Sequence, residues 1–268
     1  MKLVEISIIC LLFAVSSCGD ETTATDPAET VDGKTEKSNE SLDARAKREI
    51  MASLAIPVNE KFTMRIYKEY INADTIEDAI ITINRMEYAM DEAIKNNRQA
   101  KAAEMGFTGN YNYLFYYDGA LDRISNPVFA PSSPGRELDI EFKSIIAPTR
   151  KDVIVGYRIR NSGWKSYFSV FNDHDLMMVF QWKAFDYAGE DHPEAFVHTY
   201  EENPNQVPMD IAIYASEIDS YTKNVGDIYT YLPSITKKKE LLFKFFLDPV
   251  EKKYRLYPEF AKNLPKKV

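Results

Sequence analysis

Apolar residues in the first part of the chain recur mainly every three or four positions, as they do along one face of a helix. Ser41 is suited to cap a short helix over 42–54, which ends before Pro57. A longer helix is predicted over 74–105, and the segment 61–71 between them is compatible with a helix or a strand. The apolar stripe of the longer helix consists of Ile76, Ile80, Ile83, Met86, Met90 and Ile94. We expect this stripe to pack in the core, with a partner-binding groove as the alternative.

After Gly109 the pattern changes to the alternation of apolar and polar residues that is typical of β-strands. The predicted strands cover 137–146, 152–160, 165–171, 176–187, 195–200, 209–215, 227–232, 241–247 and 253–257. Short turn sequences such as Asn161-Ser162-Gly163 connect neighbouring strands. The chain is therefore expected to have an α+β fold, with an N-terminal helix or helices followed by a mainly antiparallel β-sheet or β-sandwich of about nine strands. No internal repeat is apparent, and 41–268 is predicted to be a single globular domain.

The N-terminal residues have the pattern of an export signal. Lys2 provides a positive start, and the apolar run over 6–15 is too short to span a bilayer of about 30 Å. The run ends in Val15-Ser16-Ser17-Cys18, which resembles the lipobox of bacterial lipoproteins. The resemblance implies that residues 1–17 are removed as a signal peptide and that Cys18 becomes an acylated, palmitate-carrying N-terminus. An ordinary cleaved signal peptide is the alternative.

The residue after the cysteine bears on the destination of the protein. Gly19 stands where enteric lipoproteins retained in the inner membrane have aspartate, so the resemblance implies delivery to the outer membrane. The segment 19–40 contains seven acidic and two basic residues, and Val31 is its one sizeable apolar side chain. Such a segment cannot bury enough apolar surface to fold, so 18–40 is predicted to be a lipidated N-terminus with a disordered acidic tether.

The charge of the chain argues against nucleic acid as a partner, because 41 acidic residues outnumber 33 basic ones. Basic residues nevertheless gather near the C-terminus, where 237–268 contains ten of them against four acidic residues. We expect this segment to be solvated or paired with acidic residues of the domain. Contact with anionic lipid headgroups is the alternative.

The sequence contains few residues that could carry chemistry. Its two cysteines, Cys10 and Cys18, both lie in the N-terminal signal region, so the domain has no disulfide and no cysteine nucleophile. Phosphate-binding loops, hydrolase elbows and zinc-protease motifs are absent, and no catalytic residue is predicted. Three histidines lie among carboxylates and are candidate ligands of a divalent metal: His174, His192 and His198. Their spacing matches no known ligand motif, which favours ordinary surface and strand positions.

Aromatic residues are abundant, with 17 tyrosines, 15 phenylalanines and two tryptophans. Exposed aromatic faces can stack on sugar rings, and the candidate ligand-binding residues are Trp164, Trp182 and Tyr113. Packing in the core of a β-sandwich is the alternative for each of them. Trp164 is the strongest candidate because it follows a turn and lies beside Lys165.

Three functions are compatible with these features. The first is a membrane-anchored envelope lipoprotein that acts by protein–protein contact, as an accessory or assembly component of an envelope machine. The second is a surface lipoprotein that binds a glycan or another small ligand. The third is a metal-assisted hydrolase built on the histidines. The absence of catalytic motifs favours the first, with a lipid anchor and an envelope protein as partners and no cofactor.

Overall fold

The computed structural model describes residues 40–104, 109–171, 174–219, 228 and 231–264. The predicted signal peptide and nearly all of the tether lie outside the described residues, as does half of the predicted strand 227–232, whose described residues form no strand. Glu40–Val268 forms one unit of contacts. It begins with helix α1 (Leu42–Ser53), whose first turn is capped by the Ser41 hydroxyl accepting a hydrogen bond from the Ala44 N–H at 3.3 Å. The predicted N-terminal helix is therefore confirmed.

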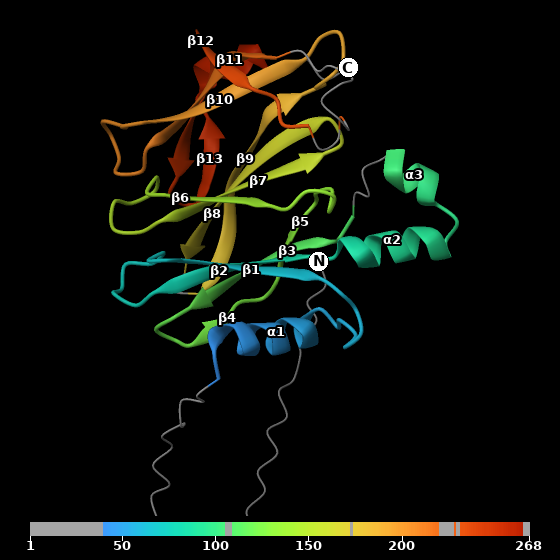
Figure 1. Cartoon of the computed structure of the whole chain (residues 1–268). Helices are drawn as coiled ribbons and strands as arrows, with labels where there is room; N and C mark the ends of the chain where they lie inside the picture. Colours follow the sequence, from blue (N-terminus) through green and yellow to red (C-terminus); the bar gives the residue numbers. More distant parts are fainter. Residues whose placement is uncertain (1–39, 105–108, 172–173, 220–227, 229–230, 265–268) are drawn as a thin grey trace, which may run out of the picture. The chain divides into compact units, whose positions relative to one another are not determined.

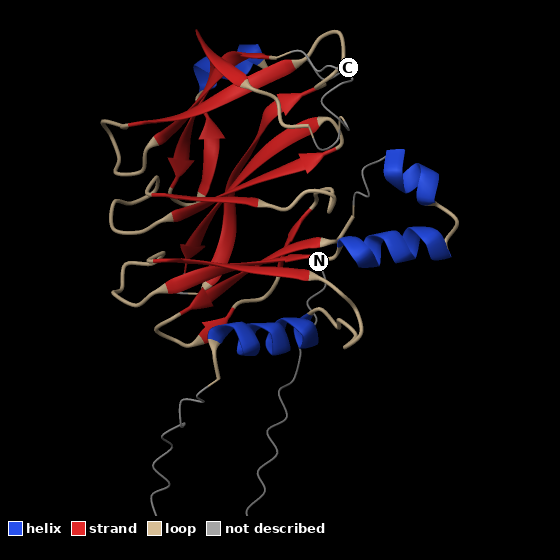
Figure 2. Cartoon of the chain, viewed as in Figure 1, coloured by secondary structure: helices blue, strands red, loops and turns tan. Residues whose placement is uncertain are grey.

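Two antiparallel sheets follow the helix (Figures 1 and 2). The five-stranded sheet consists of β1 (Thr63–Glu69), β2 (Asp78–Asn84), β3 (Asn112–Asp118), β4 (Arg123–Ile124) and β5 (Val128–Ala130). The eight-stranded sheet consists of β6 (Asp139–Lys143), β7 (Asp152–Ile159), β8 (Ser162–Phe171), β9 (Asp175–Asp186), β10 (Glu194–Glu201), β11 (Asp210–Ile218), β12 (Ile235–Asp248) and β13 (Lys253–Leu256). A 3₁₀ helix, η2 (Pro258–Asn263), follows the last strand. The mainly antiparallel α+β fold is thus confirmed, with more strands than the pattern predicted.

The core is organised in layers. Ala46 and Ile50 of α1 pack on one face of the five-stranded sheet. The other face of that sheet packs on β6–β9, where Ile80 and Tyr116 join a cluster with Val155 of β7. The opposite face of β7–β9 packs on β11–β13 and forms a second core. The buried residues of this second core include Ile154, Tyr167, Phe180, Ile213, Phe243 and Phe245. The eight-stranded sheet therefore curves until its second half covers its first half, and burial of these apolar faces stabilises the stack at roughly 25 cal/mol per Å².

Three groups of four consecutive antiparallel strands share one design: β1–β4, β6–β9 and β10–β13. In each group the first two strands are joined by eight residues, 70–77, 144–151 and 202–209. The returning strand always begins with an aspartate that is 1% exposed: Asp78, Asp152 or Asp210. These equivalent positions show that the chain contains an internal structural repeat.

Each aspartate fixes the connection that precedes it. Asp78 accepts the N–H groups of Ile71 and Asn72 at 3.2 and 3.1 Å. Asp152 accepts the N–H groups of Ile145 and Ile146, seven and six residues earlier, at 2.9 and 2.8 Å. In the third group the side-chain amide of Asn203 donates to Asp210 at 2.7 Å.

Successive connections also bind one another. The Ile71 carbonyl accepts the Lys151 N–H at 2.8 Å, and the Ile145 carbonyl accepts the Met209 N–H at 2.9 Å. The expectation that the chain contains no repeat was therefore wrong. The sequence signal is short: Ala73-x-Thr75-x-x-Asp78 matches Ala147-x-Thr149-x-x-Asp152, and the third group keeps the aspartate alone.

Replacing Asp152 with alanine should lower the free energy of unfolding by about 2 kcal/mol, because two buried backbone N–H groups lose their acceptor. Burial raises the pKa of Asp152, so part of the cost is recovered by removing a desolvated carboxylate. Urea unfolding followed by circular dichroism measures the change. Asp139→Ala is the matched control, because that side chain is 71% exposed. Equal losses in the two variants would contradict the proposed role.

The predicted helix over 74–105 is wrong in its first half. Asp78–Asn84 forms β2, and helices α2 (Met86–Lys95) and α3 (Gln99–Glu104) follow it. The six residues 78–83 are all buried, because α1 covers one face of β2 and the eight-stranded sheet covers the other. A strand buried on both faces has no alternation, and its isoleucines can match a helical spacing by chance.

Helices α2 and α3 lie in the link between the second and third strands of the first group, and they extend to one side of the sheets (Figure 1). The equivalent link of the second group is two residues long, 160–161. The helical pair is therefore an addition to the repeat.

Candidate functional site

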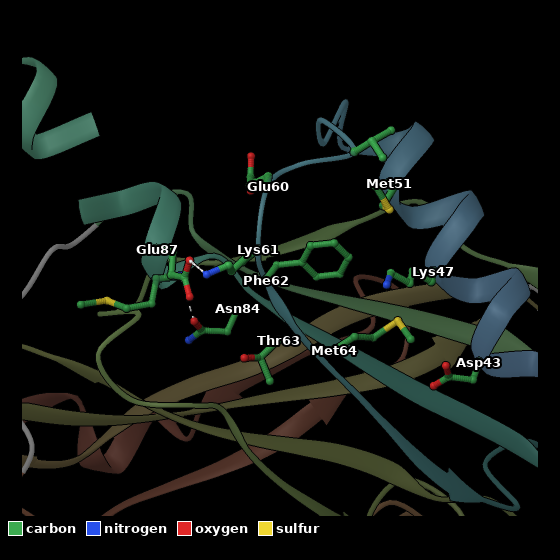
Figure 3. A pocket seen from close by; sticks show the side chains of 12 residues that line it. Asp43, Lys47, Met51, Glu60, Lys61, Phe62, Thr63, Met64, Asn84 and Glu87 are labelled. Atoms are coloured by element: carbon green, nitrogen blue, oxygen red, sulfur yellow. Dashed lines mark hydrogen bonds and ion pairs between the residues drawn. The ribbon is translucent and has the colours of Figure 1, made fainter. Parts of the chain in front are cut away.

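A groove of about 800 Å³ lies between α1 and the start of α2, at the first residues of β1 (Figure 3). Its lining comes from α1, the 55–62 connection, the adjoining ends of β1 and β2, and α2. The lining residues are Asp43, Lys47, Met51, Val58, Glu60, Lys61, Phe62, Thr63, Met64, Asn84, Met86 and Glu87. Thr63 and Asn84 are opposite each other in the β1–β2 pair, so the groove is placed where the hairpin ends.

The apolar part of the groove is rich in methionine. Met51 comes from α1, Met64 from β1 and Met86 from α2, and Phe62 lies beside them in the lining. The unbranched thioether side chain adapts to differently shaped apolar surfaces, which is why methionine is common on protein-binding surfaces. Seven polar or charged residues share the lining with five apolar ones, so the groove suits a partner surface that carries both kinds of side chain.

A buried ion pair holds the groove in place. The Arg85 guanidinium donates to both carboxylate oxygens of Glu60, at 2.6 and 2.7 Å, and both side chains are only 9% exposed. These hydrogen bonds raise the pKa of Arg85 above its usual value. The guanidinium also lies 4.2 Å from the ring centre of Tyr88 in α2. The connection that carries Phe62 is thereby fixed to the start of α2.

The apolar surface continues from the groove along α2. Met86, Met90 and Ile94 are spaced by four residues, so they lie on one face of the helix. Met90 is 44% exposed and Ile94 is 53% exposed. The predicted core stripe is therefore correct for Ile80 and Ile83, which are buried in β2, and wrong for the exposed residues Ile76, Met90 and Ile94. The apolar spacing in the sequence is the same on both sides of Arg85. The positions differ in burial because the chain changes from strand to helix at that residue.

A second pocket, of about 180 Å³, lies beside Trp164. It is lined by Arg136, Asp139, Gly156, Tyr157, Arg158, Gly163, Trp164, Lys165, Ala184, Phe185, Leu232, Pro233 and Ile235. The Lys183 ammonium lies 5.7 Å from the centre of the Trp164 ring. Trp164 is thus among the lining residues, and its side chain packs against the core between the two sheets.

The other two aromatic candidates belong to packed clusters. Trp182 lies in the core between β9 and β12, with its ring centre 5.0 Å from that of Phe243 and 5.3 Å from that of Phe245. Tyr113 packs on Phe129 at 6.2 Å, and its hydroxyl donates to the Asn110 carbonyl at 2.8 Å. Trp182 is paired with Lys165, next to Trp164, but the two tryptophans pack on opposite faces of the sheet. Tyr113 belongs to the five-stranded sheet, so the three candidates do not form one platform.

The three histidines lie in separate surroundings. The ring of His174 packs 6.1 Å from that of Tyr116, in the core between the two sheets. His192 is exposed in the β9–β10 connection, where it lines a shallow hollow with Glu190 and Asp191. His198 lies inside the curved sheet. In the part of the chain that the structure describes, no group of three or more histidine, cysteine, aspartate or glutamate residues is arranged to hold a metal ion.

His198 is a neutral hydrogen-bonding residue of the core. Its Nε2 is 2.9 Å from the Lys183 carbonyl, which can only accept, so Nε2 carries the proton. Nδ1 then accepts the Tyr167 hydroxyl at 2.6 Å, and Tyr167 lies 3.2 Å from the hydroxyl of Tyr200. Burial lowers the pKa of His198 to about 4. This arrangement satisfies the ring nitrogens internally and presents no reactive atom to a ligand.

None of the helices among the described residues has the length and the apolar content that crossing a membrane requires. Comparison with protein-family models, with curated proteins and with solved structures found no match.

Proposed function

We propose that this chain is a lipid-anchored protein of the bacterial envelope that acts by binding a partner protein. The partner binds at the α1–α2 groove and the adjoining face of α2, which together we call the docking surface. Its central residues are Met51, Phe62, Met64, Met86, Met90 and Ile94. The observation that carries the proposal is the exposure of Met90 and Ile94 on the face of α2 that also bears Met86, a residue of the groove. Single exposed apolar side chains are ordinary, whereas contiguous ones mark interaction sites.

The charges around this surface indicate the kind of partner. Glu87 and Asp91 lie one turn apart on α2, and Asp43 lies at the facing side of the groove. Glu87 is 3.7 Å from Lys61 in an exposed pair, whereas Asp43 and Asp91 form no ion pair within the described residues. Lys47 and Lys61 also line the groove, so its rim carries both charges. The carboxylates of Asp43 and Asp91 fit an amphipathic helix that carries lysine or arginine beside its apolar face.

The anchor in this proposal is Cys18, in the outer membrane. Replacing Cys18 with alanine should move the protein from the membrane fraction to the aqueous fraction, because one or more acyl chains at that residue supply the attachment. Labelling with an alkyne analogue of palmitate, followed by fractionation, measures both lipid and location. Cys10→Ala is the matched control and should leave both unchanged, since that residue lies in the removed signal. Retention of the label in the Cys18 variant would contradict the assignment.

The docking surface is tested by photo-crosslinking in intact cells. A benzophenone amino acid at position 94 should give one dominant adduct, and the same group at exposed position 207 should not give it. The further substitution Met90→Glu should reduce the adduct at least tenfold, because a charge on this face of α2 opposes burial against the partner. Mass spectrometry of the adduct should place the crosslink on an apolar helical face with basic neighbours.

The matched control for this substitution is Val207→Glu, which introduces the same charge at a residue that is 73% exposed and lies in the β10–β11 connection. It should leave the crosslink at position 94 unchanged. Circular dichroism of both variants confirms that α2 persists. Equal crosslinking from positions 94 and 207, or a crosslink that survives Met90→Glu, would contradict the proposal.

A further inference from the structure

The three repeated connections lie at one end of the molecule. Backbone hydrogen bonds join 70–77 to 144–151 and 144–151 to 202–209, so the connections form a row. The β3–β4 turn, 119–122, adjoins this row, because the Gly119 N–H donates to the same buried aspartate that fixes the first connection, at 3.0 Å. Figure 1 shows the three connections on the left, whereas α2 and α3 extend to the right. We call these four segments the connection end.

The connection end carries exposed apolar side chains on three of its four segments. These side chains are between 47% and 73% exposed: Tyr70, Ile76, Leu121 and Val207. Their backbone is held in place. Asp118 accepts the Leu121 N–H at 2.8 Å, and Asp74 accepts an N–H of the first connection at 2.7 Å. Apolar side chains on segments that are already ordered lose little entropy on binding, and a group of them at one end of a molecule marks an interaction surface.

The chain also enters the domain at this end. The Arg45 guanidinium donates to the Asp122 carbonyl, and the Tyr117 hydroxyl donates to the Asp122 carboxylate at 2.9 Å. Because α1 begins at Leu42, less than one helical turn before Arg45, the domain starts beside the β3–β4 turn. In the proposed function, residues 19–40 link this point to the lipid at Cys18. A flexible chain of 22 residues spans about 25 Å, so this end of the domain is held near the bilayer.

The charges of the connection end balance. Its carboxylates and cations are Asp74, Glu77, Asp122 and Glu202, and Arg150 and Lys151. Glu77 is paired with Lys68 at 2.8 Å, and Asp122 is paired with Arg45, so four negative charges are matched by four positive ones. A surface without net charge gains nothing from anionic headgroups, whereas its apolar side chains can enter the headgroup region of a neutral bilayer.

We propose that the connection end binds the zwitterionic phospholipid surface of the membrane that holds Cys18. The side chains that enter the headgroup region are Tyr70, Ile76, Leu121 and Val207. This inference rests on the lipid anchor of the proposed function. Because the anchor makes the second contact intramolecular, even a weak apolar contact is occupied.

The docking surface lies at the opposite end of β1 and β2. The pairing of these strands runs from Thr63 and Asn84, at the groove, to Glu69 and Asp78, at the connection end. Contact with lipid at one end therefore turns the groove and α2 away from the bilayer. Val207→Glu, the control for the photo-crosslink, can weaken the lipid contact and still leave the docking surface free.

Fluorescence quenching in vesicles tests this contact with the lipidated protein. Cys10 leaves with the signal peptide and the sulfur of Cys18 carries lipid, so Val207→Cys introduces the one free thiol, which takes an NBD fluorophore. The protein is reconstituted in phosphatidylcholine and phosphatidylethanolamine vesicles, with or without a nitroxide on the lipid acyl chains. We expect at least threefold quenching of this fluorophore by the nitroxide. The matched control is Val58→Cys, at an exposed residue before the opposite end of β1, where the same fluorophore should not be quenched.

Further substitutions show what supports the contact. Adding Tyr70→Glu and Leu121→Glu should reduce the quenching at position 207 at least threefold, whereas adding Val58→Glu should leave it unchanged. Circular dichroism confirms that each variant is folded. Raising the salt concentration from roughly 50 mM to roughly 500 mM should change the quenching little, because the charges of the connection end balance.

Flotation of the vesicles separates this inference from the proposed function. Protein that does not float with the vesicles contradicts the lipid anchor, and with it this inference. Protein that floats but is quenched equally at positions 207 and 58, or at neither, overturns the lipid contact of the connection end alone. Loss of the quenching in salt, or quenching that survives Tyr70→Glu and Leu121→Glu, would also overturn it.

Discussion

Glu60→Gln should lower the free energy of unfolding by about 3 kcal/mol, the largest loss that we expect from a single side-chain substitution in this chain. The reason is that Arg85 then stays buried and charged without its carboxylate partner, which now accepts both guanidinium hydrogen bonds. Urea unfolding followed by circular dichroism measures the loss. Because Glu60 lines the groove, the same variant should also weaken the photo-crosslink from position 94.

The matched control is Glu87→Gln, at the exposed ion pair with Lys61 in the same groove. It should cost less than about 1 kcal/mol, because exposed pairs are screened by water. Replacing Glu60 and Arg85 together, with glutamine and methionine, should restore part of the stability by removing the unpaired charge. If Glu60→Gln and Glu87→Gln have equal costs, the buried pair does not hold the groove.

The stability of the fold should fall by about 3 kcal/mol between pH 6.5 and pH 4 through His198 alone. Burial lowers the pKa of this imidazole to about 4 in the folded protein, whereas in the unfolded chain it keeps its usual value near 6.5. Below pH 6.5 the unfolded chain therefore takes up a proton that the folded protein does not bind. The stabilisation is fully present above pH 6.5 and is lost as the pH falls toward 4.

The effect is measured as a difference between two unfolding curves. Burial raises the pKa of Asp78 and of Asp152, so these groups oppose the histidine as the pH falls. Subtracting the pH profile of His198→Gln from that of the wild-type protein removes their contribution. His192→Gln, at an exposed histidine, is the control and should leave the profile unchanged. A flat difference between wild type and His198→Gln would show that the ring is charged or solvated in the folded state.

The sequence predicted the serine cap of α1 and the strands from 137 onward, other than 227–232. It found β7 although both of its faces are buried, because turn residues such as Asn161-Ser162-Gly163 mark the end of that strand. The pattern failed at β2, where both faces are buried and the alternation disappears. It also missed the repeat, because a buried aspartate closing an eight-residue connection is one residue of signal in about sixty.

The candidate sites were predictable only in part, for a similar reason. Trp164 and Trp182 lie on neighbouring strands, and the sequence around each alternates in the same way. Their side chains pack on opposite faces of the eight-stranded sheet: Trp164 toward the five-stranded sheet, and Trp182 into the core that the curved sheet closes around it. The groove between α1 and α2 joins segments that are distant in the sequence, and its apolar residues resemble core residues until the layers are assembled.

The order of the layers also has a mechanical consequence. A load that enters the chain at residue 40 reaches α1 first, and the proposed docking surface lies between that helix and α2. Tension between the membrane and a bound partner would therefore pass through α1 and the ends of β1 and β2. The strands from β6 to β13 lie outside this force path. Under load, the contact of Ala46 and Ile50 with the five-stranded sheet would have to resist the shear of α1.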